Sequence, residues 1–226
     1  MKFLSDIQVY IIRVVDLLYS LVFCLRCFPF ADAIKIPVNI SHQVKVSQIG
    51  RGAIVFLQPI QHNMLYLGHQ GFTAIAPHQG IIHIEKGSHL VVEGKARFAQ
   101  GVRIWMENGS KLQVGDNFYA NVNCFFRAYD DIIIGKDVLL GWNIAFNTSD
   151  GHSIIYADGE AENHQSIHVG EHVWIASDVT LSKGVCLPDG TIVAQRSLVC
   201  SQFSQPMTVI GGIPAKILKK EVNWKI

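Results

Sequence analysis

Histidine and carboxylate side chains gather in one polar stretch of the sequence, residues 147–166, which reads NTSDGHSIIYADGEAENHQS. An imidazole with its ordinary pKa near 6.5 can accept or release a proton at neutral pH, which makes His152 and His164 candidates for acid–base chemistry. Asp150 lies two residues before His152, so in an extended segment both side chains would point to the same side. Asp150 could then orient the imidazole or help to hold an acceptor; its alternative role is a turn residue before Gly151.

The segments around this stretch carry an aliphatic residue at every sixth position. Residues 169–199 divide into VGEHVW IASDVT LSKGVC LPDGTI VAQRSL V. A period of six fits neither an amphipathic helix nor an ordinary alternating strand. It predicts a hexapeptide-repeat solenoid, a parallel β-helix in which three hexads make one triangular coil and coils stack at about 4.8 Å. The same step recurs less regularly between Ile81 and Phe146, with a corner bulge at Asp130-Asp131.

These periods divide the chain into three parts. We expect a helix over residues 1–33, a β-helix over residues 34–206 with irregular first coils and an extruded loop at 147–166, and a tail over residues 207–226. A long excursion inside a regular solenoid usually carries function, because the coils are rigid without it. Alternatively, the loop could pack against a neighbouring subunit.

The first thirty residues have a helical spacing of apolar side chains, at positions 7, 11, 14, 18, 21, 25 and 28. Charged residues interrupt them, so we expect neither a transmembrane helix nor a secretory signal. Two interpretations stay open: the helix caps the open end or flank of the coil stack, or it rests on the inner membrane surface. We interpret Cys24 and Cys27, one helical turn apart, as packing residues.

Composition excludes some classes of function. The net charge of +1 over 226 residues gives no support for a nucleic-acid partner. Apolar residues make up 49% of the chain, which is enough for a substantial inner column. The five cysteines are an odd number without a framework spacing, which favours a reduced, cytoplasmic setting.

Four motifs carry a family resemblance: GDNFYANVN at 115–123, DGH at 150–152, GEHVWIAS at 170–177 and GGIPAKIL at 211–218. Together with the hexad frame they resemble the left-handed β-helix acyltransferases, which include galactoside, maltose and xenobiotic acetyltransferases. The chain is most similar to the capsular and O-antigen polysaccharide O-acetyltransferases, including those that act on polysialic acid. The resemblance covers roughly residues 112–220. It implies a left-handed coil and a homotrimer with acetyl-CoA bound between neighbouring subunits.

The resemblance also implies a reaction and a role for particular residues. It implies acetyl transfer from acetyl-CoA to a sugar hydroxyl of a bacterial surface polysaccharide, with His152 as the general base and no metal. Trp174 would wall the pocket beside the thioester, and the backbone N–H groups of Ala176 and Ser177 would stabilise the oxyanion. Asn123 would contact the acceptor hydroxyl, and the loop residues Glu162 and His164 could also contact the acceptor.

The remaining implied contacts are with coenzyme A. Lys216 and Lys219 match basic positions near the phosphates, and Pro214 matches a position near the adenine. The chain departs from the family at Ala194-Gln195-Arg196-Ser197, where the family often has G-A-G-S, so we expect Ala194 and Arg196 to flank the pantetheine and phosphate path in an altered way.

Four alternatives remain open. One is N-acetylation of an amino-sugar nucleotide. Another is a zinc carbonic anhydrase, which needs three histidines that converge across a subunit boundary; the candidates are His164, His168 and His172. A third is a scaffold without activity, although His152 is present. The last is a cysteine acyl-enzyme on Cys124, Cys186 or Cys200.

Overall fold

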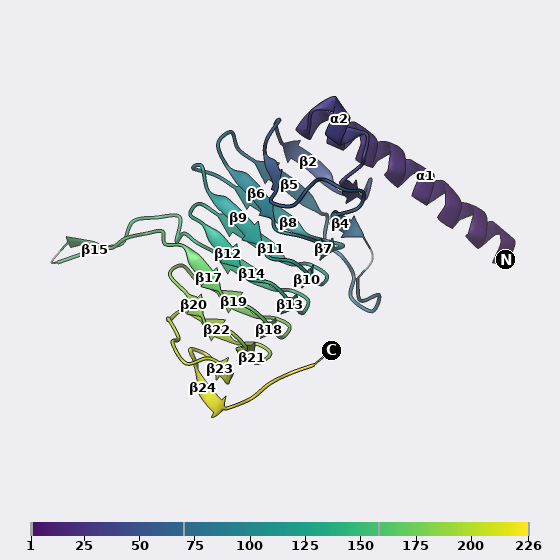
Figure 1. Ribbon diagram of the computed structural model, residues 1–226. Coiled ribbons are helices and arrows are strands. Elements are labelled where there is room, and N and C mark those ends of the chain that lie inside the picture. The colour runs from purple at the N-terminus through teal and green to yellow at the C-terminus, as the bar shows by residue number, and fades with distance from the viewer. Residues whose placement is uncertain (1, 70, 158, 226) are drawn as a thin grey trace.

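The chain winds into a stack of triangular coils whose strands form three parallel sheets (Figure 1). The structure is a computed structural model that describes residues 2–69, 71–157 and 159–225. The predicted left-handed β-helix of hexapeptide repeats, with its N-terminal helix, is confirmed.

Each side of the triangle is one sheet, named here sheet A, sheet B and sheet C. Sheet A contains β1 (Val38–Ile40), β4 (Leu65–His69), β7 (Ala96–Ala99), β10 (Phe118–Ala120), β13 (Leu139–Leu140), β18 (Trp174–Ile175), β21 (Ile192–Val193), β23 (Thr208–Gly212) and β24 (Ala215–Lys220). Sheet B contains β2 (Lys45–Gln48), β5 (Ile81–Ile84), β8 (Arg103–Met106), β11 (Phe125–Ala128), β14 (Ala145–Asn147), β19 (Thr180–Leu181) and β22 (Leu198–Val199). Sheet C contains β3 (Ile54–Phe56), β6 (His89–Val92), β9 (Lys111–Val114), β12 (Ile132–Ile134), β17 (Ile167–Val169) and β20 (Cys186–Leu187).

The strands pair so that the aliphatic at the head of each hexad stacks on its counterpart in the next coil. In sheet A, Ile175 is in register with Leu140 on one side and Val193 on the other, and Val193 is in register with Ile210. All four side chains are fully buried. The period of six therefore follows from the geometry, because every coil must place an apolar side chain inside at the same point on each face.

Aromatic rings stack within the inner column. Phe126 stacks on Phe146 with 5.0 Å between ring centroids, and it meets Phe98 edge-on at 5.4 Å. Phe98 in turn lies 5.0 Å from Phe118. Asn and Asp residues occupy many of the corners between sheets with positive φ, such as Asn117 at 58° and Asp178 at 61°. These two residue types tolerate the left-handed conformation that a tight corner requires.

Helix α1 (Lys2–Cys27) and the short helix α2 (Phe30–Ala33) lie at the N-terminal end of the stack (Figure 1). The face of α1 that packs on β1 contains Asp16, Ser20, Phe23, Cys24 and Cys27, all buried. The two cysteines are packing residues, as predicted.

The apolar spacing noted in the sequence belongs to the opposite face of α1. Ile11, Val14, Leu18 and Leu25 are exposed and Leu21 is half-buried, whereas Phe28, just beyond the end of α1, is buried in the core; the side chain of Ile7 lies outside the described part of the structure. Part of the helix therefore caps the stack, but through another face than the apolar spacing suggested. In the part of the chain that the structure describes, no helix is long and apolar enough to cross a membrane.

The C-terminal segment continues sheet A before it leaves the coils. β23, which falls within the predicted tail, pairs in parallel with β21 and in antiparallel with β24. The turn between β23 and β24 follows Gly212, whose φ of 104° is one that a residue with a side chain rarely adopts.

The aromatic column predicts a large effect of one substitution. Phe126→Ala removes a fully buried ring between two others, so we expect the free energy of unfolding to fall by about 3–5 kcal/mol in chemical denaturation. His168→Ala, which truncates an exposed side chain on β17, is the control and should change it by no more than about 0.5 kcal/mol. Equal losses for the two variants would contradict this description of the core.

Candidate active site

The loop that carries His152 and the predicted oxyanion donors lie at two different corners of the triangular coil. The extruded loop leaves the stack between β14 and β17, at the corner between sheets B and C, and contains the hairpin β15 (Ile155–Tyr156) and β16 (Gly159–Glu160). Figure 1 shows this hairpin reaching far out from the coils. Ala176 and Ser177 follow β18, at the corner between sheets A and B.

His152 is exposed near the start of the loop. Within the described residues its imidazole makes no hydrogen bond, so both ring nitrogens are available to a substrate. The preceding Gly151 has φ 81°, a conformation that favours glycine and turns the chain outward there. The sequence Asp-Gly-His therefore presents the histidine to solvent.

Asp150 forms an ion pair with a lysine, and not with His152. Its Oδ2 lies 2.7 Å from Nζ of Lys183, which belongs to the next coil at the same corner. Lys183 also donates to the backbone oxygen of Glu162, and the Glu162 carboxylate accepts from Gln165 at 2.7 Å. Lys183 thus joins the two ends of the loop, and in this structure Asp150 anchors the loop.

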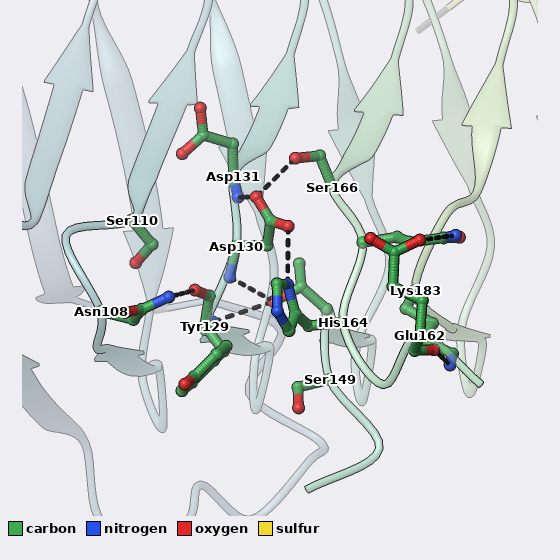
Figure 2. Close-up of polar contacts among 12 residues, drawn as sticks. Asn108, Ser110, Tyr129, Asp130, Asp131, Ser149, Glu162, His164, Ser166 and Lys183 are labelled. Carbon is green, nitrogen blue, oxygen red and sulfur yellow. Dashed lines mark hydrogen bonds and ion pairs between the residues drawn. The ribbon is translucent and has the colours of Figure 1, made fainter. Parts of the chain in front are cut away.

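His164 forms a second anchor of the loop, with Asp130 (Figure 2). Its Nδ1 lies 3.1 Å from Asp130 Oδ2, while Ser166 Oγ donates to Asp130 Oδ1 at 2.8 Å. Partial burial acts to raise the pKa of Asp130, but hydrogen bonds from Ser166, His164 and the Asp131 backbone outweigh burial and hold this pKa below its usual value. His164 remains 38% exposed in its side chain, so an acceptor could still reach it.

Two cations beside the loop were missed by the sequence reasoning, Arg127 and Lys183. Arg127 points outward from β11, and its Nη1 lies 3.4 Å from both the Asn147 side-chain oxygen and the Ser149 backbone oxygen. Arg127 and Asn147 are register partners in neighbouring coils. The sequence spacing of Arg127 and Asn147 could have predicted this contact, because residues that are one coil apart on the same face become neighbours.

The predicted coenzyme corner is a column of small residues. Gly141, Ala176 and Ala194 follow three successive sheet A strands, so they stack at the corner between sheets A and B. The N–H of Ala176 already donates to Val193 O at 2.9 Å within the ladder. Ser177 is buried, and its N–H makes no hydrogen bond to the described residues. Of the two predicted oxyanion donors, Ser177 N–H is therefore the one still available.

Asn123 belongs to the same corner, away from His152. It is 4% exposed, and its side-chain oxygen accepts from the His78 backbone at 2.7 Å while its nitrogen donates to Ala76 O at 3.1 Å. The excursion between β4 and β5 lies over it, and Phe72 of that excursion stacks on Trp142. The amide is thus engaged inside the chain, and its predicted contact with an acceptor hydroxyl would require these bonds to open.

Trp174 lies on the outer face of sheet A and is 38% exposed. Its ring centroid is 6.2 Å from that of Trp224, which stacks on His172. A cleft of about 590 Å³ lies beside them, lined by Asn117, Tyr119, Asp137, Val138, Leu139, His172, Trp224 and Lys225. This cleft is on the side of sheet A that meets sheet C, so it is separate from both predicted clusters.

The remaining predicted coenzyme residues are exposed on the surface near the C-terminal end. Arg196 occupies a corner with φ 58°, one coil beyond Ser177. Pro214 lies in the turn between β23 and β24, and Lys216 and Lys219 project from β24. All three basic side chains are exposed, and within the described residues none of them is paired with a carboxylate.

The structure bears on parts of two alternatives. Burial raises the pKa of the Cys124 thiol to about 12, and that side chain is fully buried in the inner column, so Cys124 cannot act as the nucleophile of an acyl-enzyme. This argument does not apply to the half-buried Cys186 or the exposed Cys200. His164, His168 and His172 lie at one corner, on the outer face of sheet C and at another corner respectively. They do not converge on one point within a single chain, and the carbonic anhydrase alternative would require them to meet across a subunit boundary.

Comparison with known proteins identifies the family. The chain is 30% identical over 149 residues to galactoside O-acetyltransferase of Escherichia coli (strain K12), an alignment that covers 62% of this chain and 70% of that protein. It is 29% identical over 130 residues to the putative lipopolysaccharide biosynthesis O-acetyl transferase WbbJ of the same strain, covering 53% of this chain and 66% of WbbJ. The chain thus spans about two thirds of the length of these curated relatives. No protein-family model matches it.

A solved structure shares the fold. The polySia specific acetyltransferase NeuO superposes with a TM-score of 0.51 at 18% sequence identity, covering 84% of this chain and 79% of that one. On the strength of the match to galactoside O-acetyltransferase, the chain belongs to the hexapeptide-repeat acetyltransferase family. The predicted class of enzyme, an acetyl-CoA-dependent acyltransferase, is confirmed.

The Asp130 cluster leads to a prediction about the loop. Asp130→Asn removes the carboxylate that holds His164 and Ser166, so we expect faster amide hydrogen exchange over residues 148–166, with the coils unchanged. Asp131→Asn is the matched control, because the Asp131 carboxylate lies at the same corner but accepts from the backbone N–H of Lys111 in the preceding coil, and not from the loop. Because the folded pKa of Asp130 is depressed, its stabilising contribution is present above about pH 4 and is lost as pH falls through the folded value. Equal exchange in both variants would contradict a specific anchor.

Proposed function

We propose that the protein transfers an acetyl group from acetyl-CoA to a sugar hydroxyl of a bacterial surface polysaccharide, of capsule or O-antigen type. Membership of the hexapeptide-repeat acetyltransferases supports the transfer, and the similarity to a galactoside O-acetyltransferase and to WbbJ supports a carbohydrate acceptor. The observation that carries the proposal is an exposed His152 on a loop that is anchored to the coils, with Arg127 and Lys183 beside it. The free cysteines are consistent with a cytoplasmic enzyme.

In this proposal His152 removes the proton from the attacking hydroxyl. A sugar hydroxyl is a poor nucleophile until a base takes that proton, and the solvent-facing imidazole can reach a bulky acceptor. The hydroxyl oxygen attacks the thioester carbonyl, the Ser177 N–H stabilises the oxyanion, and the thiol of coenzyme A leaves with the proton returned by His152. Glu162 and His164 lie on the same loop and would line the approach of the acceptor. Trp174 would wall the thioester side.

A complete site requires a second copy of the chain. His152 lies at the corner between sheets B and C, whereas Ser177, Ala194 and Arg196 lie at the corner between sheets A and B. The filled inner column separates these corners in one chain. In a homotrimer with parallel stacks, the His152 loop of one copy would face the small-residue corner of its neighbour. Acetyl-CoA would then lie in the groove between them.

The C-terminal hairpin would complete the coenzyme site in this arrangement. Coenzyme A carries several phosphates, and Arg196, Lys216 and Lys219 are exposed cations on the same end of the stack as the small-residue corner. Pro214, in the turn between β23 and β24, would contact the adenine.

Loss of the base tests the chemistry. His152→Ala should lower the rate of thiol release from acetyl-CoA in the presence of acceptor by about 10²-fold or more. The measurement uses capsular oligosaccharides, simple sugars and amino-sugar nucleotides as acceptors, and His168→Ala, exposed elsewhere on the coils, is the control. Stimulation by an amino-sugar nucleotide alone would replace O-acetylation with N-acetylation, and an unchanged rate in His152→Ala would overturn the assignment of the base.

Mixing of inactive variants tests the shared site. We expect His152→Ala and the double variant Arg196→Glu/Lys216→Glu each to be inactive, the second because acidic groups repel the phosphates. All three substitutions are at exposed positions, so folding should be retained. If each site takes one half from each of two copies, co-expression of the two variants restores about a quarter of the sites in random 1:1 oligomers. No recovery in isolated mixed oligomers would place the whole site within one chain.

A further inference from the structure

The exposed face of α1 is the largest run of unpartnered apolar side chains on the described surface. Ile11 is 55% exposed, Leu18 58% and Val22 58%. The other exposed apolar side chains of this helix are Val9, Tyr10, Ile12, Val14, Val15, Leu17 and Leu25. Figure 1 shows that α1 lies across the N-terminal end of the stack and that its first turns project beyond the coils.

Specific polar contacts fix the rotation of α1 about its axis. Ser20 Oγ accepts from the Ile40 N–H at 2.9 Å, and the Tyr19 hydroxyl donates to Val44 O at 2.9 Å. The Asp16 carboxylate accepts a hydrogen bond from the backbone N–H of His42 at 2.7 Å. The same carboxylate lies 2.6 Å from Nδ1 of the His42 imidazole. Turning the apolar face toward the stack would break all of these buried and partly buried bonds. The apolar face therefore points away from the coils and needs a partner outside the chain.

The charges on the helix indicate which partner fits. Between Val9 and Arg26 the exposed charged side chains are Arg13 and Arg26, whereas the acidic Asp16 is buried against the coil stack. The described surface of this stretch thus combines a broad apolar face with positive charge and no exposed carboxylate. This combination is typical of helices that lie in the interface of a bilayer containing anionic lipid. Tyr10, at 69% exposure, suits the level of the headgroups.

A second copy of α1 fits this surface less well. Positions 11, 14, 18, 21 and 25 follow heptad spacing, but the flanking positions that usually carry charges in a coiled coil are the apolar Tyr10, Val15, Leu17 and Val22. In a trimer with parallel stacks, the three apolar faces would also point to the same side instead of toward one another. The same arrangement gives a membrane surface three helices at once, which multiplies the avidity.

We propose that α1 seats the protein on an anionic membrane surface through this face, with the coils and the acetyl-transfer site held outside the bilayer. The buried contacts of residues 16–27 with the first coil keep the helix parallel to the end of the stack, so it lies on the surface instead of inserting along its length. The proposal does not depend on the proposed reaction.

Flotation of the full-length protein with vesicles tests the proposal. The vesicles are phosphatidylcholine alone or with about a third phosphatidylglycerol. We expect the wild type to float with the anionic vesicles, and Ile11→Gln/Leu18→Gln/Val22→Gln to lose at least about 100-fold in affinity because three apolar contacts are removed. Arg13→Gln/Arg26→Gln should lose about five-fold per arginine on anionic vesicles and little on neutral ones. Leu57→Gln/Ile155→Gln/Ile213→Gln, which changes three other exposed apolar residues, should float like the wild type.

The outcomes separate this proposal from the others. An equal loss of vesicle affinity in the Leu57/Ile155/Ile213 control, or no flotation of the wild type, would overturn the proposal that α1 binds the membrane. A concentration-dependent change in oligomer size that the α1 triple variant abolishes, without vesicle binding, would assign the face to a second copy instead. The α1 triple variant should still acetylate a soluble acceptor. Its loss of vesicle binding would then be independent of the acetyl-transfer activity.

Discussion

The structure depends on one constraint, the in-register pairing of each coil with the next. A shift of one residue along a whole strand would turn every inward side chain outward, so an extra residue is accommodated only as a local bulge at the end of a strand, as at Gln48 in β2 and His69 in β4. Additional chain can leave the stack only at a corner. Both long excursions do so, the one between β4 and β5 at the corner between sheets A and B and the loop at 147–166 at the corner between sheets B and C. The inner aliphatic and aromatic column thus decides where chemistry can be placed.

This constraint also explains why the candidate site is divided. Side chains fill the interior, so a ligand must bind on an outer face, at a corner or between copies. The small residues that could admit coenzyme A and the histidine that could serve as base occupy different corners of one chain. A triangular coil stack with candidate groups at two corners is well suited to assembly around a threefold axis. Rotation about that axis would bring the corner between sheets B and C of one copy against the corner between sheets A and B of its neighbour.

The loop carrying His152 shows how a surface excursion is kept in place. Lys183 joins Asp150 to the loop's other end, and Asp130 holds His164 and Ser166. Both anchoring side chains come from neighbouring coils at the same corner. His152 remains exposed while both ends of the loop that carries it are anchored to the coils. Helix α1 follows a similar logic, since a few buried polar bonds fix its orientation and leave its other face for an external surface.

The sequence by itself determined the coil, because a period of six has few other physical explanations, and the family motifs in residues 112–220 identified the acetyltransferase family. It also marked the loop at 147–166 as an interruption. Only the tertiary structure decided that Asp150 pairs with Lys183, that Asn123 is engaged by the excursion above it, and that the apolar spacing of α1 faces outward. These outcomes depend on which residues lie one coil apart, or on which of two apolar helix faces forms the better polar contacts. Local spacing specifies the inward side of each strand, whereas contacts across corners arise only when the coils are stacked.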